Sequence, residues 1–311
     1  MKIVERVARV DQSKCVGCKN CERHCPTDAI KVTPGVMPGY VPPCGTACPA
    51  GTDVQGYIAL AGAGRYEDAY RLIRQSNPFP SVCGRICNHP CQAACNRNDL
   101  DESVGIRDIK RFVADKAFEN GMPVVEKKRK SNGKKIAVIG AGPSGLSCAY
   151  YLQLSGYSVE VFESESVAGG VLAYGIPEYR LPKAVLNRDI QAIEATGVQI
   201  HLNTTVGEDV SFDELYKKFH AVYVSTGTQL SRKANIPGED MPGVYHGLDF
   251  LKAVNLGKPV EIGKKVAVIG GGNTAIDAMQ YTVKPDFVFP TALLNELDFR
   301  NHRIIAVTCH R

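Results

Sequence analysis

The sequence has no long run of apolar residues. Its first ten residues mix charged and apolar side chains, and no later stretch approaches 18 apolar residues in a row. A secretory signal peptide and a membrane-spanning helix both need a continuous apolar segment. We therefore expect a cytoplasmic chain with no membrane partner.

The one strongly basic segment has no aromatic residues. The net charge is +5, and residues 126–135 account for this whole excess with six Lys and Arg side chains against one Glu. Nucleic-acid-binding segments often interleave aromatic and basic side chains. We therefore expect a solvated linker here and no nucleic-acid partner.

Cysteine, by contrast, is abundant. The chain has 12 cysteines, and ten of them precede residue 96. Disulfide scaffolds are typical of short secreted chains, whereas this chain has 311 residues and no apolar leader. Metal binding is the better explanation of the cysteines.

The first four cysteines form a run that is typical of bacterial ferredoxins. The spacing is C-x2-C-x2-C-x3-C-P, with Cys15, Cys18, Cys21 and Cys25 as the candidate ligands. In this spacing three thiolates surround one 4Fe–4S cluster, and the fourth ligates a neighbouring cluster in two-cluster ferredoxins. The run predicts iron–sulfur rather than zinc. Since it occurs once, Cys25 either closes the same cluster or reaches a cluster built from later cysteines.

Six further cysteines lie in sequence interrupted by Gly and Pro. Four of them recur at every fourth residue, a spacing that metal ligation from loops and helix starts explains most simply. We expect helices over residues 54–63 and 66–75, and an amphipathic helix over 104–118. The six candidate ligands are Cys44, Cys48, Cys83, Cys87, Cys91 and Cys95.

Residues 134–163 read as strand, glycine turn, helix and second strand. A β-branched run at 136–139 is typical of a strand buried in a parallel sheet. In the turn that follows, Gly140 permits the tight bend, Gly142 lets the backbone approach a pyrophosphate, and Gly145 lets the helix pack close to the strand. The pattern predicts a dinucleotide site.

Other residues of this segment are candidate ligands of the same dinucleotide. Pro143 and Ser144 begin the helix, whose free N–H groups and positive dipole end face the phosphates. Glu163 closes the second strand about 20 residues past the glycines, where a carboxylate can bind both hydroxyls of an adenosine ribose. Residues 221–224 read as another buried strand, and Thr226 and Gly227 mark its turn beside the nucleotide.

The opening of this pattern recurs at residues 264–279. There Gly270, Gly272, Asn273 and Thr274 follow a strand of the same type. Two such units in one chain predict two bound nucleotides. That is the arrangement needed to pass hydride between a nicotinamide and a flavin.

Several motifs together resemble the glutamate synthase small-subunit family, which includes related NAD(P)-dependent iron–sulfur flavoproteins and the N-terminal part of dihydropyrimidine dehydrogenase. The resemblance covers about residues 40–280, and the ferredoxin run matches an extra module of some members. The motifs are Cys44-x3-Cys48-Pro, CGRIC–PC–C, DIKRF, GAGPSGL, YGIPEYRLP, STG, IPGED and GGGNTAID.

The family resemblance implies an α-helical iron–sulfur domain, followed by an FAD domain with an inserted NAD(P) domain. It implies that Cys48, Cys87 and Cys91 bind one cluster, while Cys44 and Cys95 contribute to another. It also implies that Gly169 and Gly170 approach the flavin or its phosphates, and that Gly175, Ile176, Pro177 and Arg180 line the isoalloxazine. The alternative for this last group is a loop packed for shape.

Two departures from the family concern the clusters. The C-x2-C pair that some relatives place before Cys44 is missing, and Lys110 stands where others carry a Glu or Gln ligand. Six cysteines cannot fill eight ligand positions. The cluster count is therefore two or three, with Cys83 as a candidate substitute ligand.

After Ala278 the chain departs from the family pattern. A helix starting at Asn273 should lead within about 20 residues to a second strand ending in basic residues, which choose between NADPH and NADH. Because residues 283–302 lack that pattern, we expect a truncated chain or a shifted reading frame, with exposed sheet edges and apolar surface. The alternative is a delayed second strand at 303–311, ending in His310 and Arg311.

We therefore expect an α/β, Rossmann-like flavoprotein with two dinucleotide sites, preceded by an α-helical iron–sulfur domain and a small ferredoxin-like module. The expected domains are a ferredoxin-like module at 1–35, a helical iron–sulfur domain at 36–126, a basic linker at 127–134, an FAD domain at 135–245 and an incomplete NAD(P) domain at 246–311.

The expected activity is that of an oxidoreductase. It would pass electrons from NAD(P)H through FAD to two or three 4Fe–4S clusters, and on to a partner subunit or ferredoxin. Hydride transfer demands no acid–base or nucleophilic side chain, so we name no catalytic residue. The alternatives are an electron-transfer module without its own NAD(P)H activity and a non-functional fragment of a longer gene product.

Overall fold

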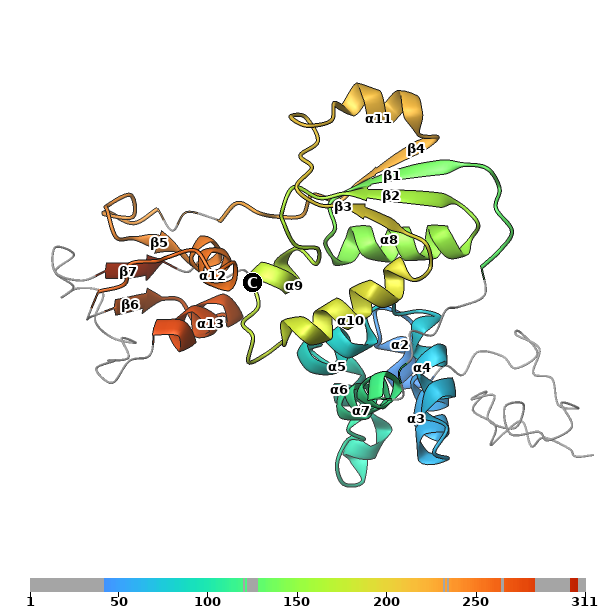
Figure 1. Cartoon of the computed structure of the whole chain (residues 1–311). Coiled ribbons are helices and arrows are strands. Elements are labelled where there is room, and N and C mark those ends of the chain that lie inside the picture. Colours follow the sequence, from blue (N-terminus) through green and yellow to red (C-terminus); the bar gives the residue numbers. More distant parts are fainter. Residues whose placement is uncertain are drawn as a thin grey trace, which may run out of the picture. The chain divides into compact units, whose positions relative to one another are not determined.

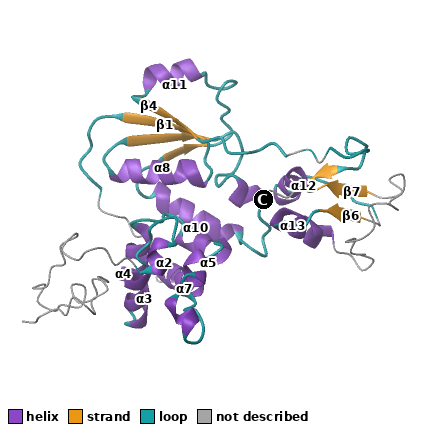
Figure 2. Cartoon of the chain, turned by 180° about the vertical axis from the view of Figure 1, so that it is seen from behind, coloured by secondary structure: helices purple, strands orange, loops and turns teal. Residues whose placement is uncertain are grey.

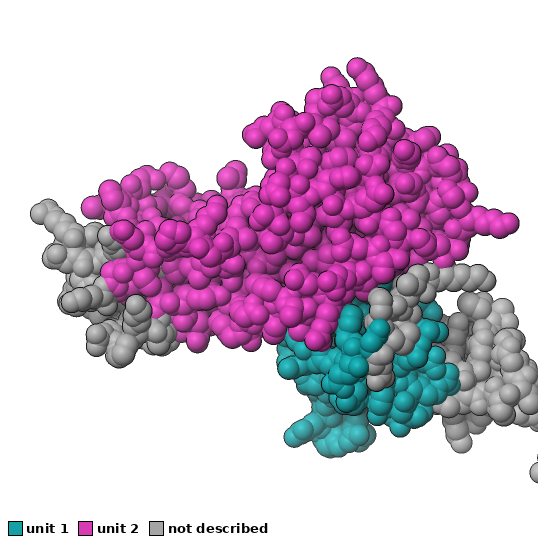
Figure 3. All heavy atoms as spheres, in the orientation of Figure 1, with its two compact units in different colours: residues 1–124 teal, residues 125–311 magenta. Residues whose placement is uncertain are grey.

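A computed structural model describes residues 42–119, 121, 128–231, 233, 235–263, 266–282 and 303–306. The chain divides into two compact units, residues 1–124 and 125–311 (Figure 3). The ferredoxin-type run at residues 15–25 lies outside the described residues. The other six candidate cysteines and the candidate nucleotide-binding residues lie inside them.

The described part of unit 1 is helical (Figure 1). The proline at the start of α2, α5 and α6 suits the first helical position, where φ is fixed favourably and no N–H is needed. Each of these three helices carries one candidate cysteine. The elements are α2 (Pro43–Thr46), α3 (Val54–Gly62), α4 (Tyr66–Arg74), α5 (Pro80–Ile86), α6 (Pro90–Ala93), the 3-10 turn η1 (Asn96–Asp99) and α7 (Ile106–Glu119).

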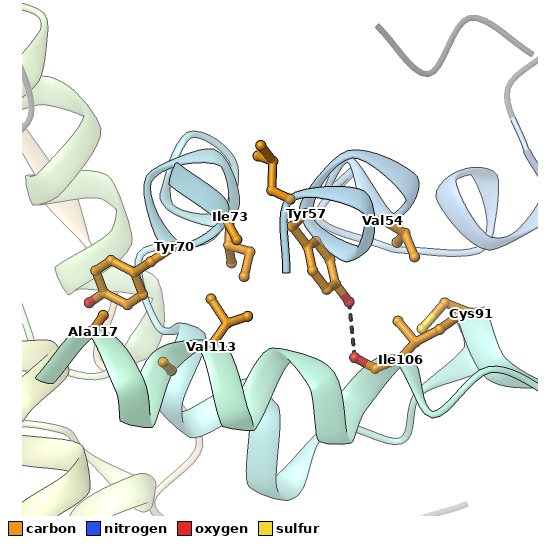
Figure 4. Packing of buried hydrophobic residues seen from close by; sticks show 11 residues of the cluster. Val54, Tyr57, Tyr70, Ile73, Cys91, Ile106, Val113 and Ala117 are labelled. Carbon is orange, nitrogen blue, oxygen red and sulfur yellow. Dashed lines mark hydrogen bonds between the residues drawn. The ribbon is translucent and has the colours of Figure 1, made fainter. Parts of the chain in front are cut away.

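The core of unit 1 forms where α7 packs against α3, α4 and α5. Tyr57, Tyr70, Ile73 and Val113 are fully buried there (Figure 4). Burial of each large apolar side chain stabilises the fold by about 1.5–3 kcal/mol. The Tyr57 hydroxyl donates a hydrogen bond to the Ile106 carbonyl at 3.0 Å, so its polar end is satisfied inside this core. The three helices expected from the sequence are confirmed to within two residues at each end.

The first sheet of unit 2 is parallel and has the order β3-β2-β1-β4. Its strands are β1 (Lys135–Ile139), β2 (Ser158–Phe162), β3 (Gln199–His201) and β4 (Ala221–Val224). In the register, Val138 of β1 lies between Val161 of β2 and Tyr223 of β4. Helix α8 (Pro143–Leu154) lies on one face and α11 (Phe212–Lys218) on the other (Figures 1 and 2). The predicted strand, turn, helix and strand of residues 134–163 are confirmed.

Between β2 and β3 the chain forms two more helices, α9 (Val171–Tyr174) and α10 (Lys183–Glu194). The basic residues 128–135 have exposed side chains, yet their backbone is held by unit 2. The Arg129 N–H donates to the Leu154 carbonyl at 2.9 Å, and the Asn132 N–H donates to the Gly156 carbonyl at 3.0 Å. None of the helices in the described ranges combines the length and apolar character that crossing a bilayer requires.

A second parallel sheet of unit 2 has the order β5-β7-β6. Its strands are β5 (Tyr245–His246), β6 (Val266–Ile269) and β7 (Arg303–Ala306), and it is covered by α12 (Gly247–Asn255) and α13 (Asn273–Thr282). The start of α13 at Asn273 is confirmed. Because β7 pairs in parallel with β6, the delayed strand considered at 303–311 is present over its first four residues. His310 and Arg311 lie outside the described residues.

One expectation about the first sheet is wrong. The strand at Ala221–Val224 has the predicted bounds but is not buried, since Tyr223 is 40% exposed and Val224 is 59% exposed. The reason is its position: among the described strands, β4 pairs only with β1 and forms the edge of the sheet. Strand β4 is therefore largely exposed, although most of its residues are apolar.

The exposed edge leads to a prediction about solubility. Replacing Val224 with Lys places a charge on the edge strand, which blocks edge-to-edge pairing between chains. We expect less aggregate in size-exclusion chromatography and light scattering, with a free energy of unfolding changed by no more than about 0.5 kcal/mol.

The matched control is Tyr216→Lys on α11. Tyr216 is 73% exposed but does not belong to a strand. If this control lowers aggregation as much as Val224→Lys does, general surface charge rather than the β4 edge is responsible.

Candidate functional site

The glycine turn after β1 is enforced by close packing. Gly140 has φ +100°, and a Cβ added to it would lie 2.5 Å from the Ser225 carbonyl oxygen. A Cβ on Gly145 would lie 2.0 Å from the Gly140 carbonyl oxygen. Both positions therefore need glycine for the bend and for the approach of α8 to the sheet.

Gly142 differs from these two glycines because it faces open space. A Cβ added to it would meet no protein atom within 4 Å, and Gly142 is the N-cap residue of α8. The N–H groups of the first turn of a helix have no partner within the helix. The start of α8 is therefore an accessible set of hydrogen-bond donors at the positive end of a 12-residue helix dipole.

Glu163, at the end of β2, is fixed by the backbone around it. Its side chain is buried, and its Oε2 accepts a hydrogen bond from the Ala141 N–H at 2.7 Å. Its Oε1 accepts from the Glu165 N–H at 2.9 Å and from the Ser164 hydroxyl at 3.3 Å. These donors hold the carboxylate beside the glycine turn without a cation.

These groups surround a cavity of about 290 Å³. Ligand pockets commonly measure about 300–1,000 Å³, so the cavity is of a size for part of a dinucleotide. Eight of the residues named from the sequence line it: Gly140, Gly142, Pro143, Ser144, Glu163, Gly170, Thr226 and Gly227.

Sequence reasoning missed part of the cavity wall. Thr204, Thr205 and Val206 line it from the loop after β3, Tyr174 lines it from the end of α9, and Gln229 lines it from the loop after β4. Apart from Tyr174, which begins the YGIPEYRLP motif, these residues belong to none of the motifs named from the sequence. The parallel pairing of β3 with β2 is what brings the loop after β3 to the same edge of the sheet.

Six residues named for the first site do not line the cavity: Gly145, Gly169, Gly175, Ile176, Pro177 and Arg180. Gly145 lies beneath the turn, as its packing requires. Gly169 supports the turn from behind, since its N–H donates to the Ala141 carbonyl at 2.8 Å. Arg180 instead forms an ion pair with Asp277 of α13, with 2.6 Å between Nη1 and Oδ2.

The pair between Arg180 and Asp277 also includes Tyr179. The Tyr179 hydroxyl donates to Asp277 Oδ1 at 3.0 Å, and the Asp277 side chain is 5% exposed. Partial burial and the hydrogen bond to Asp277 raise the pKa of Tyr179 to about 12. A second hydrogen bond links the end of α9 to α12, since Asn255 Nδ2 of α12 donates to the Tyr174 carbonyl at 2.8 Å. The segment after α9 is therefore tied to both α12 and α13.

The second glycine turn follows β6 in the same way that the first follows β1. Gly270 has φ +131°, and Gly272, Asn273 and Thr274 lead into α13. Ala275, the buried sixth residue of the motif, packs into the small core under α12 and β6. Asp277 lies one turn after Asn273 in the same helix.

The six cysteines in the described part of unit 1 form no disulfide with one another. Their electrostatic interactions divide them into groups. Cys91 interacts with Cys48 and Cys87, whereas Cys44 interacts with Cys95. Burial raises the pKa values of the Cys91 and Cys44 thiols.

Backbone N–H groups point at two of these sulfurs. The His89 N–H lies 3.3 Å from Cys87 Sγ, and His89 adopts a left-handed conformation with φ 44°. Burial alone would raise the pKa of Cys48. It is nevertheless lowered, because the N–H and hydroxyl of Thr52, the N–H of Ala50 and the charge of Lys110 all favour its thiolate.

This donor set fits an iron–sulfur cluster. Within the described ranges, no three Cys, His, Asp or Glu side chains are placed to hold a single metal ion. A 4Fe–4S cluster offers a separate iron to each thiolate, so its ligands need not converge on one point. The described thiols form no disulfide with one another, and the Cys87 sulfur is supplied with an N–H donor. The Cys83 sulfur lies 3.7 Å from Asn77 Oδ1, and the Cys83 carbonyl accepts a hydrogen bond from the Cys87 N–H at 3.4 Å.

Three family models match the chain. Residues 8–31 match a 4Fe-4S binding domain, residues 37–122 match dihydropyrimidine dehydrogenase domain II with its 4Fe-4S cluster, and residues 134–284 match pyridine nucleotide-disulphide oxidoreductase. The matches confirm the expected order of iron–sulfur and α/β nucleotide-binding regions.

Relatives with clear sequence similarity include two enzyme subunits. The chain is 42% identical over 251 residues to the NADPH-Fe(3+) oxidoreductase subunit beta of Geobacter sulfurreducens, which covers 79% of this chain and 37% of that protein. It is 38% identical over 256 residues to the glutamate synthase [NADPH] small chain of Escherichia coli, which covers 78% of this chain and 54% of that protein. The chain thus spans about half of their length or less.

Among solved structures, FprA of Mycobacterium tuberculosis in complex with NADPH is 29% identical, with a TM-score of 0.43 over 49% of this chain and 36% of that one. The family models and the sequence relatives agree with the glycine turns, the parallel sheets and the cysteine-bearing helices. The chain belongs to the family of NAD(P)-dependent iron–sulfur flavoprotein oxidoreductases that includes the glutamate synthase small chains.

Proposed function

We propose that this chain passes electrons from NAD(P)H through FAD to 4Fe–4S clusters, and on to a partner oxidoreductase subunit or a ferredoxin. One observation carries the proposal. The cavity at the first glycine turn combines open backbone donors with the fixed carboxylate of Glu163. The described part of the helical unit in the same chain carries six cysteines that form no disulfide with one another.

In this proposal the first turn holds FAD. Gly142, Pro143 and Ser144 bind the pyrophosphate through the start of α8, and Glu163 binds the adenosine ribose. Gly170, Thr226 and Gly227 shape the wall of the cavity. When bound, FAD accepts two electrons as hydride and releases them singly. The protein binds, orients and excludes water, and no catalytic side chain is proposed.

The second turn is proposed to bind NAD(P)H. Gly270, Gly272, Asn273 and Thr274 would take its pyrophosphate in the same manner as the first turn. The ion pair of Arg180 with Asp277 supports this arrangement, because it ties the helix after the second turn to the segment that continues from the cavity wall. We therefore assign Arg180 to positioning the two sites rather than to contact with the flavin alone.

The cysteines are proposed to hold the one-electron carriers. Cys48, Cys87 and Cys91 would ligate one cluster, and Cys44 and Cys95 would contribute to a second, with Cys83 as its candidate substitute ligand. A further cluster is proposed on Cys15, Cys18, Cys21 and Cys25. We also propose that the domains of the chain end at residues 35, 126, 134 and 245.

A partner is supported by the names of the relatives. The Geobacter protein is a beta subunit and the Escherichia coli protein a small chain, so each is named as part of a larger enzyme. The rival function is an electron-transfer module that keeps the clusters and flavin but needs another chain for NAD(P)H. The two differ in whether a nicotinamide reduces this chain by itself.

An anaerobic visible spectrum separates these functions. We expect NADPH or NADH to bleach the flavin and cluster bands of the purified chain, because hydride reaches FAD and single electrons continue to the clusters. Dithionite is the positive control for complete reduction. Bleaching by dithionite alone would reject the proposed NAD(P)H activity and favour the module.

The FAD site is tested separately by Glu163→Gln. This variant keeps the shape but removes the charge that accepts the ribose hydroxyls. Hydrogen bonds to charged groups contribute about 1.5–3 kcal/mol, so we expect FAD affinity to fall by about tenfold or more. The fluorescence of released flavin measures this loss.

The matched control is Glu160→Gln on the same strand. Glu160 pairs with His201 at 3.1 Å and is absent from the cavity wall. Its replacement should leave FAD affinity at the value of the original chain. Equal losses in both variants would mean that strand β2 is disturbed and that Glu163 has no specific role.

A further inference from the structure

Lys110 is a buried cation in the helical unit. It lies on α7, and 8% of its surface is exposed. Its ammonium group is 5.6 Å from the centre of the Tyr57 ring, on the side chain that anchors α3 to Ile106. Such an approach favours a cation modestly, by about 0.5–2 kcal/mol.

The described residues offer Lys110 no carboxylate partner. The ion pairs of α7 join Arg107 to Asp108, Arg111 to Asp115 and Lys116 to Glu119 on its more exposed surface. A buried charge without a partner is costly, and a ring face does not offset that cost. The negative charge that balances Lys110 must come from elsewhere in its surroundings.

The surroundings of Lys110 contain thiols. Lys110 lies one turn along α7 from Ile106, and Ile106 and Tyr57 belong to the same buried cluster as Cys91 of α6. Helix α6 packs against both α7 and α2, Cys87 lies three residues before α6, and Cys48 lies two residues after α2. Lys110 therefore approaches these three cysteines from α7, while the His89 N–H lies 3.3 Å from Cys87 Sγ.

We propose that Lys110 is the charge partner of the cluster held by Cys48, Cys87 and Cys91, and that it raises the reduction potential of this cluster. The inference rests on the proposed function, since it takes the three thiolates as cluster ligands. Reduction adds one negative charge to the cluster, and a fixed cation beside it stabilises the reduced state more than the oxidised state. Net charge and hydrogen bonds to the sulfurs are among the factors that set such potentials.

The test is a redox titration followed by electron paramagnetic resonance on the full chain, which resolves the clusters by their separate signals. In Lys110→Met the side chain keeps its length and loses its charge. We expect the midpoint potential of one cluster to fall by at least about 59 mV, which is a tenfold change in the reduction equilibrium constant of a one-electron couple. The other midpoints should stay where they are.

Two further variants identify charge as the cause. Lys110→Arg keeps the cation and should retain a midpoint near the original. Lys116→Met is the matched control on the same helix, because Lys116 is an exposed lysine that pairs with Glu119. It should move no midpoint. A midpoint unchanged in Lys110→Met, or moved equally in Lys116→Met, overturns the inference.

Cluster content is measured alongside as iron and acid-labile sulfide. Loss of one cluster from Lys110→Met and Lys110→Gln, with retention in Lys110→Arg, also supports a charge partner. Loss from all three variants overturns it, because the shape of lysine would then matter rather than its charge. Failure of the proposed function is distinguishable, since the unmodified chain would itself lack cluster signals.

Discussion

Both halves of this chain depend on backbone N–H groups that point at negative charge. In unit 2 the turn after β1 leaves the first N–H groups of α8 open, and the Ala141 N–H holds Glu163. In unit 1 the His89 N–H points at Cys87, and the N–H groups of Ala50 and Thr52 lower the pKa of the Cys48 thiol. Such donors are fixed by the fold and cost no side-chain entropy. Phosphate and thiolate can therefore be held where water is largely excluded.

Within unit 2, the segment after α9 connects two similar nucleotide-binding folds. It continues directly from Tyr174 in the cavity wall and reaches α13 through Arg180 and Tyr179. The carboxylate at their centre, Asp277, is nearly inaccessible to water, so its pairing with a guanidinium satisfies a charge that would otherwise be costly to bury. The two glycine turns are thereby parts of one structure rather than independent binding sites.

The sequence predicted the features that depend on residues close together in the chain. The glycine spacing located the turn and its helix, and proline and cysteine spacing placed cysteines at helix starts, where Cys44 and Cys91 lie. It did not predict helices such as α10 or the wall at Thr204–Val206, because these depend on which strands become neighbours. The exposure of β4 was missed for the same reason. Its apolar composition favours a strand, whereas its burial depends on whether another strand pairs beside it in the sheet. The ion pair of Arg180 joins residues 97 positions apart and carries no local signal.

The central claim is that this chain is an iron–sulfur flavoprotein, and cofactor content tests it most directly. The chain should be purified without oxygen and analysed for iron, acid-labile sulfide, zinc and flavin. The account predicts one FAD per chain and about eight to twelve iron atoms with matching sulfide, for two to three four-iron clusters. Zinc in place of iron and sulfide, or a chain that binds no FAD when FAD is supplied, would contradict it.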